Sequence, residues 1–271
     1  MQQQGTYCDF PGGDSWVILS PIEQSIKRKI EAVGTPLKDW DIQINYGIKT
    51  GFNDAFIIST DKRNEILANC ATDEERKKTD ELIRPILRGR DIKRYGYEWA
   101  KLWLINTHNG VKGRIPRIRI EDYPAVKAHL DKYWDKIKDR ADQGDTPYNL
   151  RNCAYLEEFF KPKIIYREIG FEMDACIIPQ GWFINNKLYL ITGDEIEYLL
   201  AFLNSKAFNK VILASANLTG GKGVDFMEKI VAPVDSKLKQ IVLSALDDGQ
   251  RERAFNDYFG FTENEIAFLN S

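Results

Sequence analysis

The chain has 271 residues, a formal net charge of −2 and 43% hydrophobic residues. This length is enough for one large or two smaller domains, and the composition is ordinary for a globular protein. No apolar run approaches the roughly 18 residues that cross a bilayer, and the first residues lack the basic and apolar regions of a signal peptide, so we expect no membrane partner. The four cysteines are far apart in the sequence, which predicts neither a zinc site nor a disulfide framework and favours a reduced, cytoplasmic setting.

Residues 1–39 are predicted to contain a linker and one helix. The stretch Met1–Trp16 is polar and rich in glycine, which is typical of a linker. The sequence Ser20–Glu23 is typical of a capping box, in which a serine and a glutamate satisfy each other's backbone at the start of a helix. We expect this helix to run to Val33. Its buried stripe would consist of Ile22, Ile26, Ile30 and Val33.

Two strands joined by a polar turn are predicted between residues 42 and 58. Alternation in Ile42–Tyr46 and the apolar run Ala55–Ile58 favour strands. Glycines in the joint permit backbone angles that other residues avoid. Such a joint is most often a plain hairpin, and the alternative is a turn whose side chains contact a ligand. The side chains that would project from it are Lys49, Thr50 and Asn53.

The remaining patterns alternate between helix and strand. Helices are predicted from Asp73 to Ile83, from Asp122 to Ile137, in two pieces from Asp194 to Leu213, and after Asp235, with Thr262–Glu265 capping the last. Strands are predicted at Trp103–Asn106, Phe160–Arg167 and Gly181–Ile191, and a Gly-rich loop at Ala216–Gly223. We therefore expect an α+β fold of mixed and antiparallel strands with packed helices and a small C-terminal helical segment.

Positive charge is concentrated between Arg84 and Arg119, which we call the basic segment. Its first twelve residues, Arg84–Tyr95, hold five cations, and Pro85 and Gly89 break the helical period there, which predicts a loop flanked by short ordered pieces. Over the whole segment ten cations, seven of them Arg, accompany only two acidic residues, a local balance of 10 − 2 = +8.

Two interpretations of the basic segment compete. Charge runs are usually a solvated surface. The alternative is a phosphate-binding site, because the planar guanidinium fork suits phosphate oxygens and guanine edges. Aromatic residues interleaved with the cations would stack on bases or belong to the core, and we favour the core for Trp99 and Trp103.

Four motifs, in order, resemble the TaqI-like C-terminal specificity domain. They are Gly47–Phe56, Leu87–Tyr95, Phe160–Glu168 and Tyr198–Lys206. The resemblance extends from about residue 40 to residue 234, and Tyr258–Ile266 resembles the helical tail of such enzymes. In that family the domain is the target-recognition module of an adenine-specific DNA methyltransferase, commonly within a fused restriction-modification polypeptide of type IIG in bacteria.

The resemblance implies a division into three parts and a set of DNA contacts. The parts are a linker and N-terminal helix at 1–39, a DNA target-recognition domain at 40–234 and a C-terminal helical tail at 235–271. The partners implied are double-stranded DNA and a methyltransferase domain in cis or in trans. For the DNA backbone we expect contacts from Lys49, Arg88, Arg90, Lys93, Arg94, Lys161 and Lys163. For base reading we expect Thr50, Asn53, Arg114, Arg117 and Arg119, while Asp91 would orient a neighbouring arginine.

The catalytic half of such an enzyme has no counterpart among the motifs of this sequence. It would need a Gly-rich loop for S-adenosylmethionine and an Asn-Pro-Pro-Tyr type motif that grips a flipped adenine. The nearest imitation, Asp145–Tyr148, lacks the double proline and is expected to be a plain turn. We therefore expect no cofactor, metal or catalytic residue here. S-adenosylmethionine, with magnesium as a further candidate, is implied for the parent enzyme, which methylates adenine with or without cutting DNA.

Other functions have weaker support. Asp61 with Glu75–Lys77 has the order of a metal-dependent nuclease motif, but the latter lies in a predicted polar helix rather than a strand. Neither His108 nor His129 accompanies a nucleophile pattern. The alternative from another class is a protein-interaction scaffold that docks subunits of a restriction complex through the acidic helical end.

Overall fold

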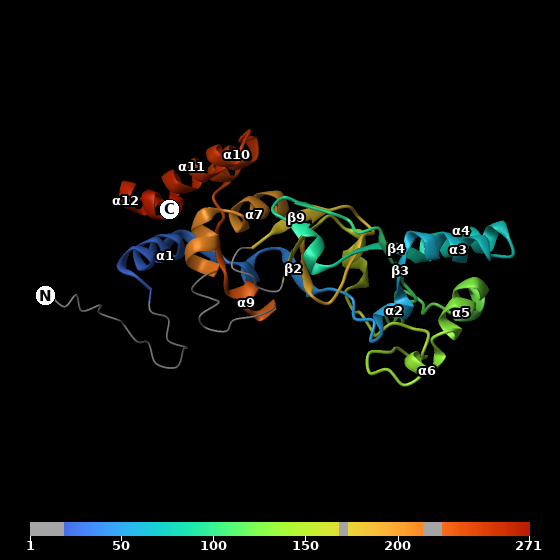
Figure 1. Cartoon of the computed structure of the whole chain (residues 1–271). Helices are drawn as coiled ribbons and strands as arrows, with labels where there is room; N and C mark the ends of the chain where they lie inside the picture. Colours follow the sequence, from blue (N-terminus) through green and yellow to red (C-terminus); the bar gives the residue numbers. More distant parts are fainter. Residues whose placement is uncertain (1–18, 168–172, 214–223) are drawn as a thin grey trace, which may run out of the picture.

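Two four-stranded sheets form the centre of the structure, a computed structural model that describes residues 19–167, 173–213 and 224–271 (Figure 1). The first sheet has the order β10 (Phe183–Ile184), β4 (Ile83–Leu87), β7 (Leu102–Ile105), β3 (Ile57–Ser59), with only the β10–β4 pair parallel. The second is antiparallel, with the order β2 (Ile42–Tyr46), β11 (Leu188–Gly193), β8 (Lys163–Arg167), β9 (Ala175–Ile178). Two small ladders pair β1 (Gly34–Pro36) with β12 (Val231–Pro233) and β5 (Ile92–Lys93) with β6 (Gly96–Tyr97). The predicted α+β class is confirmed.

The second sheet is buried on both faces. Because successive side chains of a strand point to opposite faces, Ile164 of β8 packs in one core with the helices at one end of the molecule, while Ile165 packs in another core with the first sheet. Ile191 and Leu190 of β11 divide in the same way. The nearly continuous apolar runs of these strands therefore reflect their central position.

Helices gather at one end of the elongated molecule, beside the second sheet (Figure 1). They are α1 (Pro21–Val33), α7 (Ile196–Leu203), α9 (Val224–Lys229), α10 (Ser236–Ser244), α11 (Asp248–Phe259), α12 (Glu263–Asn270) and a wide helical turn at Phe208–Leu213. The predicted first helix and its capping box are confirmed, but Val33 is 43% exposed rather than buried. The first and last helices share one core with α7, so side chains from all three expected parts of the chain pack together. The division into three parts stays a prediction. The predicted linker at 1–16 and Gly-rich loop at 216–223 lie outside the described residues.

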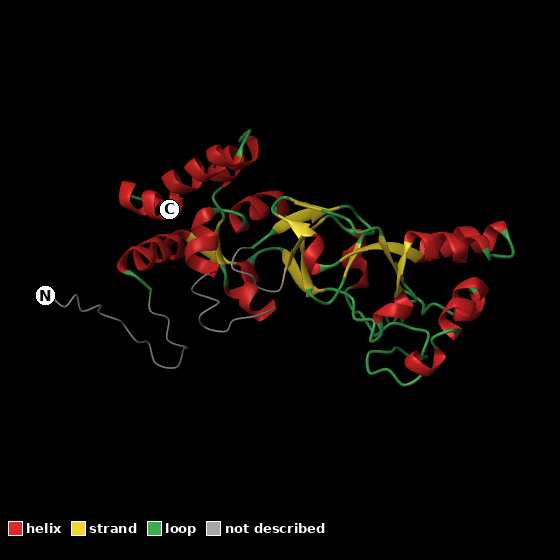
Figure 2. Cartoon of the chain, in the orientation of Figure 1, coloured by secondary structure: helices red, strands yellow, loops and turns green. Residues whose placement is uncertain are grey.

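A second group of helices covers the other end, next to the first sheet (Figure 2). It consists of α2 (Asn53–Phe56), α3 (Thr60–Ala68), α4 (Asp73–Leu82), α5 (Pro124–Asp131) and α6 (Trp134–Ile137). The single long helix predicted from Asp122 is wrong: α5 begins at Pro124, its amide at Ala125 is capped by buried Glu75, and the chain turns before α6. As a result Trp134, which a single long helix would place on the same apolar face as Val126 and Leu130, is 41% exposed.

Two further predictions are corrected by strand pairing. The strands β2 and β3 belong to different sheets, so the segment at 42–58 is no hairpin, and its second apolar run begins as the short helix α2. The start of the basic segment is strand β4 rather than loop, and Pro85 pairs with Trp103 there. No helix in the described part of the chain is long and apolar enough to cross a membrane.

Candidate nucleic-acid interface

The turn after β2 is folded tightly against the chain between β10 and β11. A Cβ at Gly47 would lie 2.1 Å from the carbonyl oxygen of Asn185, and Ile48 forms a bridge with the same residue. Gly51 has φ +68°, which other residues rarely adopt. The turn is therefore a fixed structure, and its glycines are needed for close approach and for the left-handed backbone.

Three predicted contacts lie in this turn, and the structure separates their roles. Lys49 is half-buried, with its ammonium 5.3 Å from the ring centre of Tyr46, and Asn53 is exposed. Thr50 is only 4% exposed, and its hydroxyl donates to Asn53 Oδ1 at 2.6 Å. The expectation that Thr50 reads a base is therefore contradicted by its burial; instead it orients the side chain of Asn53.

The later half of the basic segment forms a tight loop between β7 and α5. Val111 and Ile115 pair as a bridge, and the glycines at 110 and 113 have φ of +74° and +77°. Lys112 stands at the tip of this turn and is exposed. The dipeptide Asn-Gly at 109–110 is the sequence signal for such a turn.

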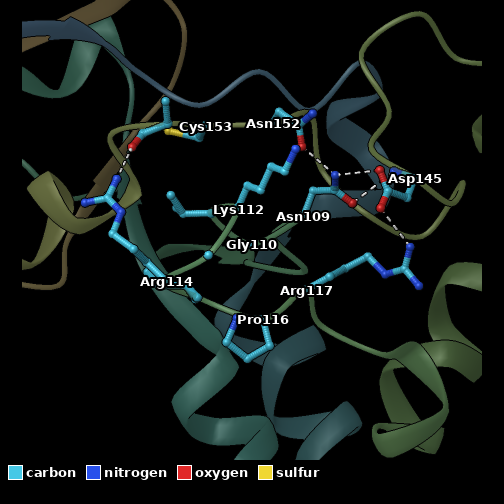
Figure 3. A pocket seen from close by; sticks show the side chains of 13 residues that line it. Asn109, Gly110, Lys112, Arg114, Pro116, Arg117, Asp145, Asn152 and Cys153 are labelled. Atoms are coloured by element: carbon cyan, nitrogen blue, oxygen red, sulfur yellow. Dashed lines mark hydrogen bonds and ion pairs between the residues drawn. The ribbon is translucent and has the colours of Figure 1, made fainter.

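A pocket of about 760 Å³ opens beside this loop (Figure 3). Its wall includes Asn109, Lys112, Arg114, Arg117, Asp145, Asn152 and Cys153. Figure 3 shows Arg114 and Arg117 extending toward opposite sides, with Lys112 between them. Burial raises the pKa of the Cys153 thiol to about 11, so it is no nucleophile at neutral pH. The pocket thus offers cations and amides, which suits an anionic, hydrogen-bonding ligand.

Both pocket arginines are held by carboxylates. Arg114 pairs with Glu157 and donates to the carbonyl of Ala154, and Arg117 Nη1 donates to Asp145 Oδ2 at 2.9 Å. The hydrogen bond from Asn109 and the charge of Arg117 lower the pKa of Asp145. Arg119 is exposed and forms no ion pair with any residue that the structure describes. These two pairs orient the guanidinium groups, while the side chains of Arg114 and Arg117 remain 58% and 39% exposed.

The earlier half of the basic segment, residues 84–98, does not line the pocket. Arg88 forms a two-pronged ion pair with buried Asp91, so the expected orienting role of Asp91 agrees with the geometry. Arg90 is exposed without an ion pair among described residues, and Lys93 lies 3.8 Å from Glu98. The backbone just before these residues is joined to the turn after β2 through Asn185, whose backbone amide donates to the carbonyl of Leu87 and which forms the bridge with Ile48.

Arg94 points to the C-terminal helices. Its Nη2 lies 3.6 Å from Asp248 Oδ2 and 3.9 Å from Glu252 Oε1, both on α11. The backbone of Tyr95 is anchored on the edge strand β9 by a hydrogen bond to Ala175. In this structure Arg94 therefore ties the basic segment to the helical tail, and a DNA contact would require breaking that pairing.

Of the two lysines predicted near residue 160, one is excluded. Lys163 is fully buried in β8, where its ammonium donates to the carbonyls of Phe159, Lys161 and Pro179 at 2.8, 3.0 and 3.2 Å. It cannot reach a phosphate, and the expectation is wrong because the strand's period turns this side chain inward. Lys161 is 52% exposed and pairs with Glu158 at 2.8 Å.

Several residues of the site were missed from the sequence. The loop at 109–119 is joined to the segment at 144–152 by two hydrogen bonds, from Asn109 to Asn152 and from Asn149 to the carbonyl of Ile118. Arg140 joins that segment to the turn after β2. Isolated amides and a lone arginine after a mixed-charge helix carry no sequence signal of such a role.

Glu75 and His129, weighed from the sequence as nuclease and general-base residues, have structural roles. Glu75 accepts hydrogen bonds from the backbone of Ala71 and Ala125 at 2.9 and 3.0 Å. His129 Nε2 lies 3.0 Å from the carbonyl oxygen of Ala55, and burial lowers the pKa of the imidazole. Among the described residues no group of His, Cys, Asp or Glu is arranged to hold a metal ion.

Comparison with known proteins decides the family. The model of the TaqI-like C-terminal specificity domain matches residues 84–222, just over half of the chain. The chain belongs to this family. The match contains the whole loop at 109–119, all but the first residue of β4, and strands β5–β11.

Relatives of this TaqI-like domain are restriction-modification proteins. The type II methyltransferase M.MjaIV of Methanocaldococcus jannaschii is 25% identical in an alignment of 221 residues, and the match covers 74% of this chain and 69% of that protein. The structure of the type IIL restriction-modification enzyme MmeI in complex with DNA aligns with a TM-score of 0.53 at 12% identity, over 87% of this chain and 35% of that one. The type IIG restriction endonuclease BpuSI gives 0.51 at 15%, over 92% and 31%. The chain thus spans about a third of these two enzymes, with which it shares a fold.

Proposed function

We propose that this chain recognises the DNA target of an adenine-specific restriction-modification methyltransferase. The observation that carries the proposal is the pocket within the family-matched segment, where Lys112, Arg114 and Arg117 surround amide side chains. Restriction-modification enzymes are its relatives, and the structure of one of them, MmeI, is a complex with DNA. Cations and amides together are the groups that bind phosphates and base edges.

We assign phosphate contacts and base contacts within the interface according to how firmly each side chain is held. Exposed cations without an ion pair to any described residue, such as Arg90, Lys112 and Arg119, would neutralise phosphates and set the register on the duplex. For Arg119 this replaces the base-reading role expected from the sequence. Arginines that carboxylates orient, and Asn53 behind its hydrogen bond from Thr50, would meet base edges in the major groove.

Partners and cofactors of the whole enzyme belong to the same proposal. A methyltransferase domain, in cis or in trans, would hold S-adenosylmethionine and the flipped adenine, while this chain holds the duplex in register. A cytoplasmic location is part of the proposal, and the cysteines at 70, 153 and 176 are free thiols. Magnesium would be needed only where the parent cuts DNA.

Hydrogen exchange with and without duplex DNA tests the proposal. We expect added duplex to slow amide exchange at 47–53 and 109–119, because those segments would become buried. The helices α10–α12, at the opposite end from α5 and α6 in Figure 1, serve as the internal control and should exchange unchanged. Slowing confined to those helices, or none anywhere, would contradict it.

A scaffold function is the second candidate, and one observation favours it. Apolar side chains are exposed on and beside α10: Leu246 is 88%, Leu243 49% and Ile241 48% exposed. A contiguous patch of such groups would mark a protein contact. Changing Leu246 and Ile241 to serine should abolish association with a methyltransferase partner under the scaffold hypothesis while leaving DNA binding intact, whereas loss of DNA binding alone would refute it.

A further inference from the structure

The backbone immediately after Arg117 is held by hydrogen bonds on both its carbonyl and its amide side. Asn149, 2% exposed, donates from Nδ2 to the carbonyl of Ile118 at 2.9 Å and to those of Thr107 and His108 at 3.4 Å. The amide of Ile118 in turn donates to His108 at 3.1 Å. A buried amide therefore clamps the two sides of the loop immediately after Arg117.

The side chain of Arg117 is held as well. Asp145 accepts from Arg117 Nη1 on one oxygen and from Asn109 Nδ2, at 2.9 Å, on the other. The backbone amide of Asp145 donates to Asn109 Oδ1 at 2.9 Å, and Asn109 also donates to Asn152 (Figure 3). This network fixes the carboxylate that orients the guanidinium.

Comparison with its neighbours sets Arg117 apart. Arg114 uses both of its terminal nitrogens within the chain, on Glu157 and Ala154. Lys112 and Arg119 are exposed, and no carboxylate among the described residues orients them. Arg117 alone in this group combines a fixed carboxylate partner on Nη1 with an Nε–Nη2 edge that makes no hydrogen bond to described residues.

We infer that Arg117 reads a guanine in the target, donating from Nε and Nη2 to O6 and N7 in the major groove, with Asp145 and Asn109 as positioning residues. An arginine fork matches those two acceptors, and no other base presents the same pair. Preorganisation is what turns such a contact into discrimination, because a side chain already oriented pays little entropy on binding. The inference rests on the proposed DNA-binding function.

Binding selections from a pool of randomised duplexes, made with the full chain, test the inference. We expect the wild-type chain to enrich a motif with at least one G·C pair. The variant Arg117→Ala should lose preference at one guanine position by about tenfold to a hundredfold and keep the others. Asp145→Asn, which retains the arginine, should weaken preference at the same position. Replacing that guanine by 7-deazaguanine should reproduce the loss in wild type and add nothing in Arg117→Ala.

Two controls separate the possible failures. Arg119→Ala should lower affinity for all sequences alike, and Arg253→Ala on the distant helix α11 should change nothing. If Arg117→Ala, still folded by its thermal unfolding profile, enriches the same motif with the same guanine preference, the inference is wrong while the proposed function stands. If wild type binds duplexes but enriches no motif, target recognition itself fails and the inference fails with it.

Discussion

At the scale of single residues, Arg140 holds the candidate interface together. It is 6% exposed, and its guanidinium donates to the carbonyls of Thr50, Ile137, Pro147 and Asn149 while lying 4.5 Å from the ring centre of Phe56. Burial lowers its pKa to about 10, so it remains a cation at neutral pH. It thereby joins the turn after β2 to the segment that carries Asp145.

Replacing Arg140 should therefore cost much stability. Arg140→Met keeps the apolar bulk but leaves several buried carbonyls without a donor, and we expect a loss of at least about 3 kcal/mol in the free energy of unfolding. Arg140→Lys should fall between it and wild type. Urea unfolding measures both, with exposed Arg253→Met as control. An unchanged midpoint for Arg140→Met would show that these hydrogen bonds do not support the fold.

Lys163 predicts a pH dependence of stability. Burial lowers its pKa from 10.5 to about 8, so between these values the unfolded chain binds a proton that the folded chain has released. Stability then rises with pH across that window, and below pH 8 the contribution of this group no longer changes with pH. We expect the free energy of unfolding of wild type, relative to Lys163→Met, to increase by about 3 kcal/mol from pH 7 to 10.5. A difference that stays flat would mean that Lys163 titrates normally.

At the scale of elements, the two ends of the chain are joined by a capping residue. Glu265 completes the capping box of α12 with Thr262 and also accepts from Ser25 and Lys29 of α1 at 2.7 Å each. Burial alone would raise the pKa of Glu265, but the hydrogen bonds from Lys29, Ser25 and Thr262 outweigh it and lower the pKa to about 2. The helix start thus doubles as a helix-to-helix contact.

Acid should loosen this contact. The folded-state pKa of Glu265 lies below its ordinary value, so its contribution is present above pH 4.5 and is lost as pH falls toward 2. At pH 7 we expect Glu265→Gln to cost about 1–3 kcal/mol, as for hydrogen bonds to charged groups. Glu263→Gln, exposed in the first turn of the same helix, is the matched control. Equal stability of the two variants at pH 7 would contradict the assignment.

Helices with local signals were predictable from the sequence, and strand partners were not. The capping residues Ser20, Thr72 and Thr262 mark true helix starts because the cap satisfies backbone donors within its own turn. The start of α5 was misplaced because its cap, Glu75, comes from another helix. Short apolar runs such as β2 and β3 reveal burial but not the sheet to which they belong.

At the scale of the whole molecule, the clustering of positive charge in the sequence predicted where cations gather. It did not predict which of these cations are free of carboxylate partners and so available to bind DNA. The basic segment divides in space: Arg94 is neutralised by α11, Arg88 by Asp91, and the loop at 109–119 faces the pocket. Partners such as Asp145 and Asp248 are distant in sequence, so pairing could not be read from local charge. Lys163 shows the same limit, since burial on a two-sided strand removes a cation from the surface.

Binding to random duplex DNA across a salt series tests the central claim most directly. We predict that the logarithm of affinity falls linearly with the logarithm of salt concentration, with a slope of about −3 or steeper, since each neutralised phosphate contributes roughly −0.9. Substituting Lys112 and Arg119 together by alanine should flatten that slope by about 2. Substituting Lys237 and Arg253 on the distant helices should leave it unchanged. A slope near zero, or one that only the distant pair alters, would contradict the assignment of the pocket end as the DNA-binding surface.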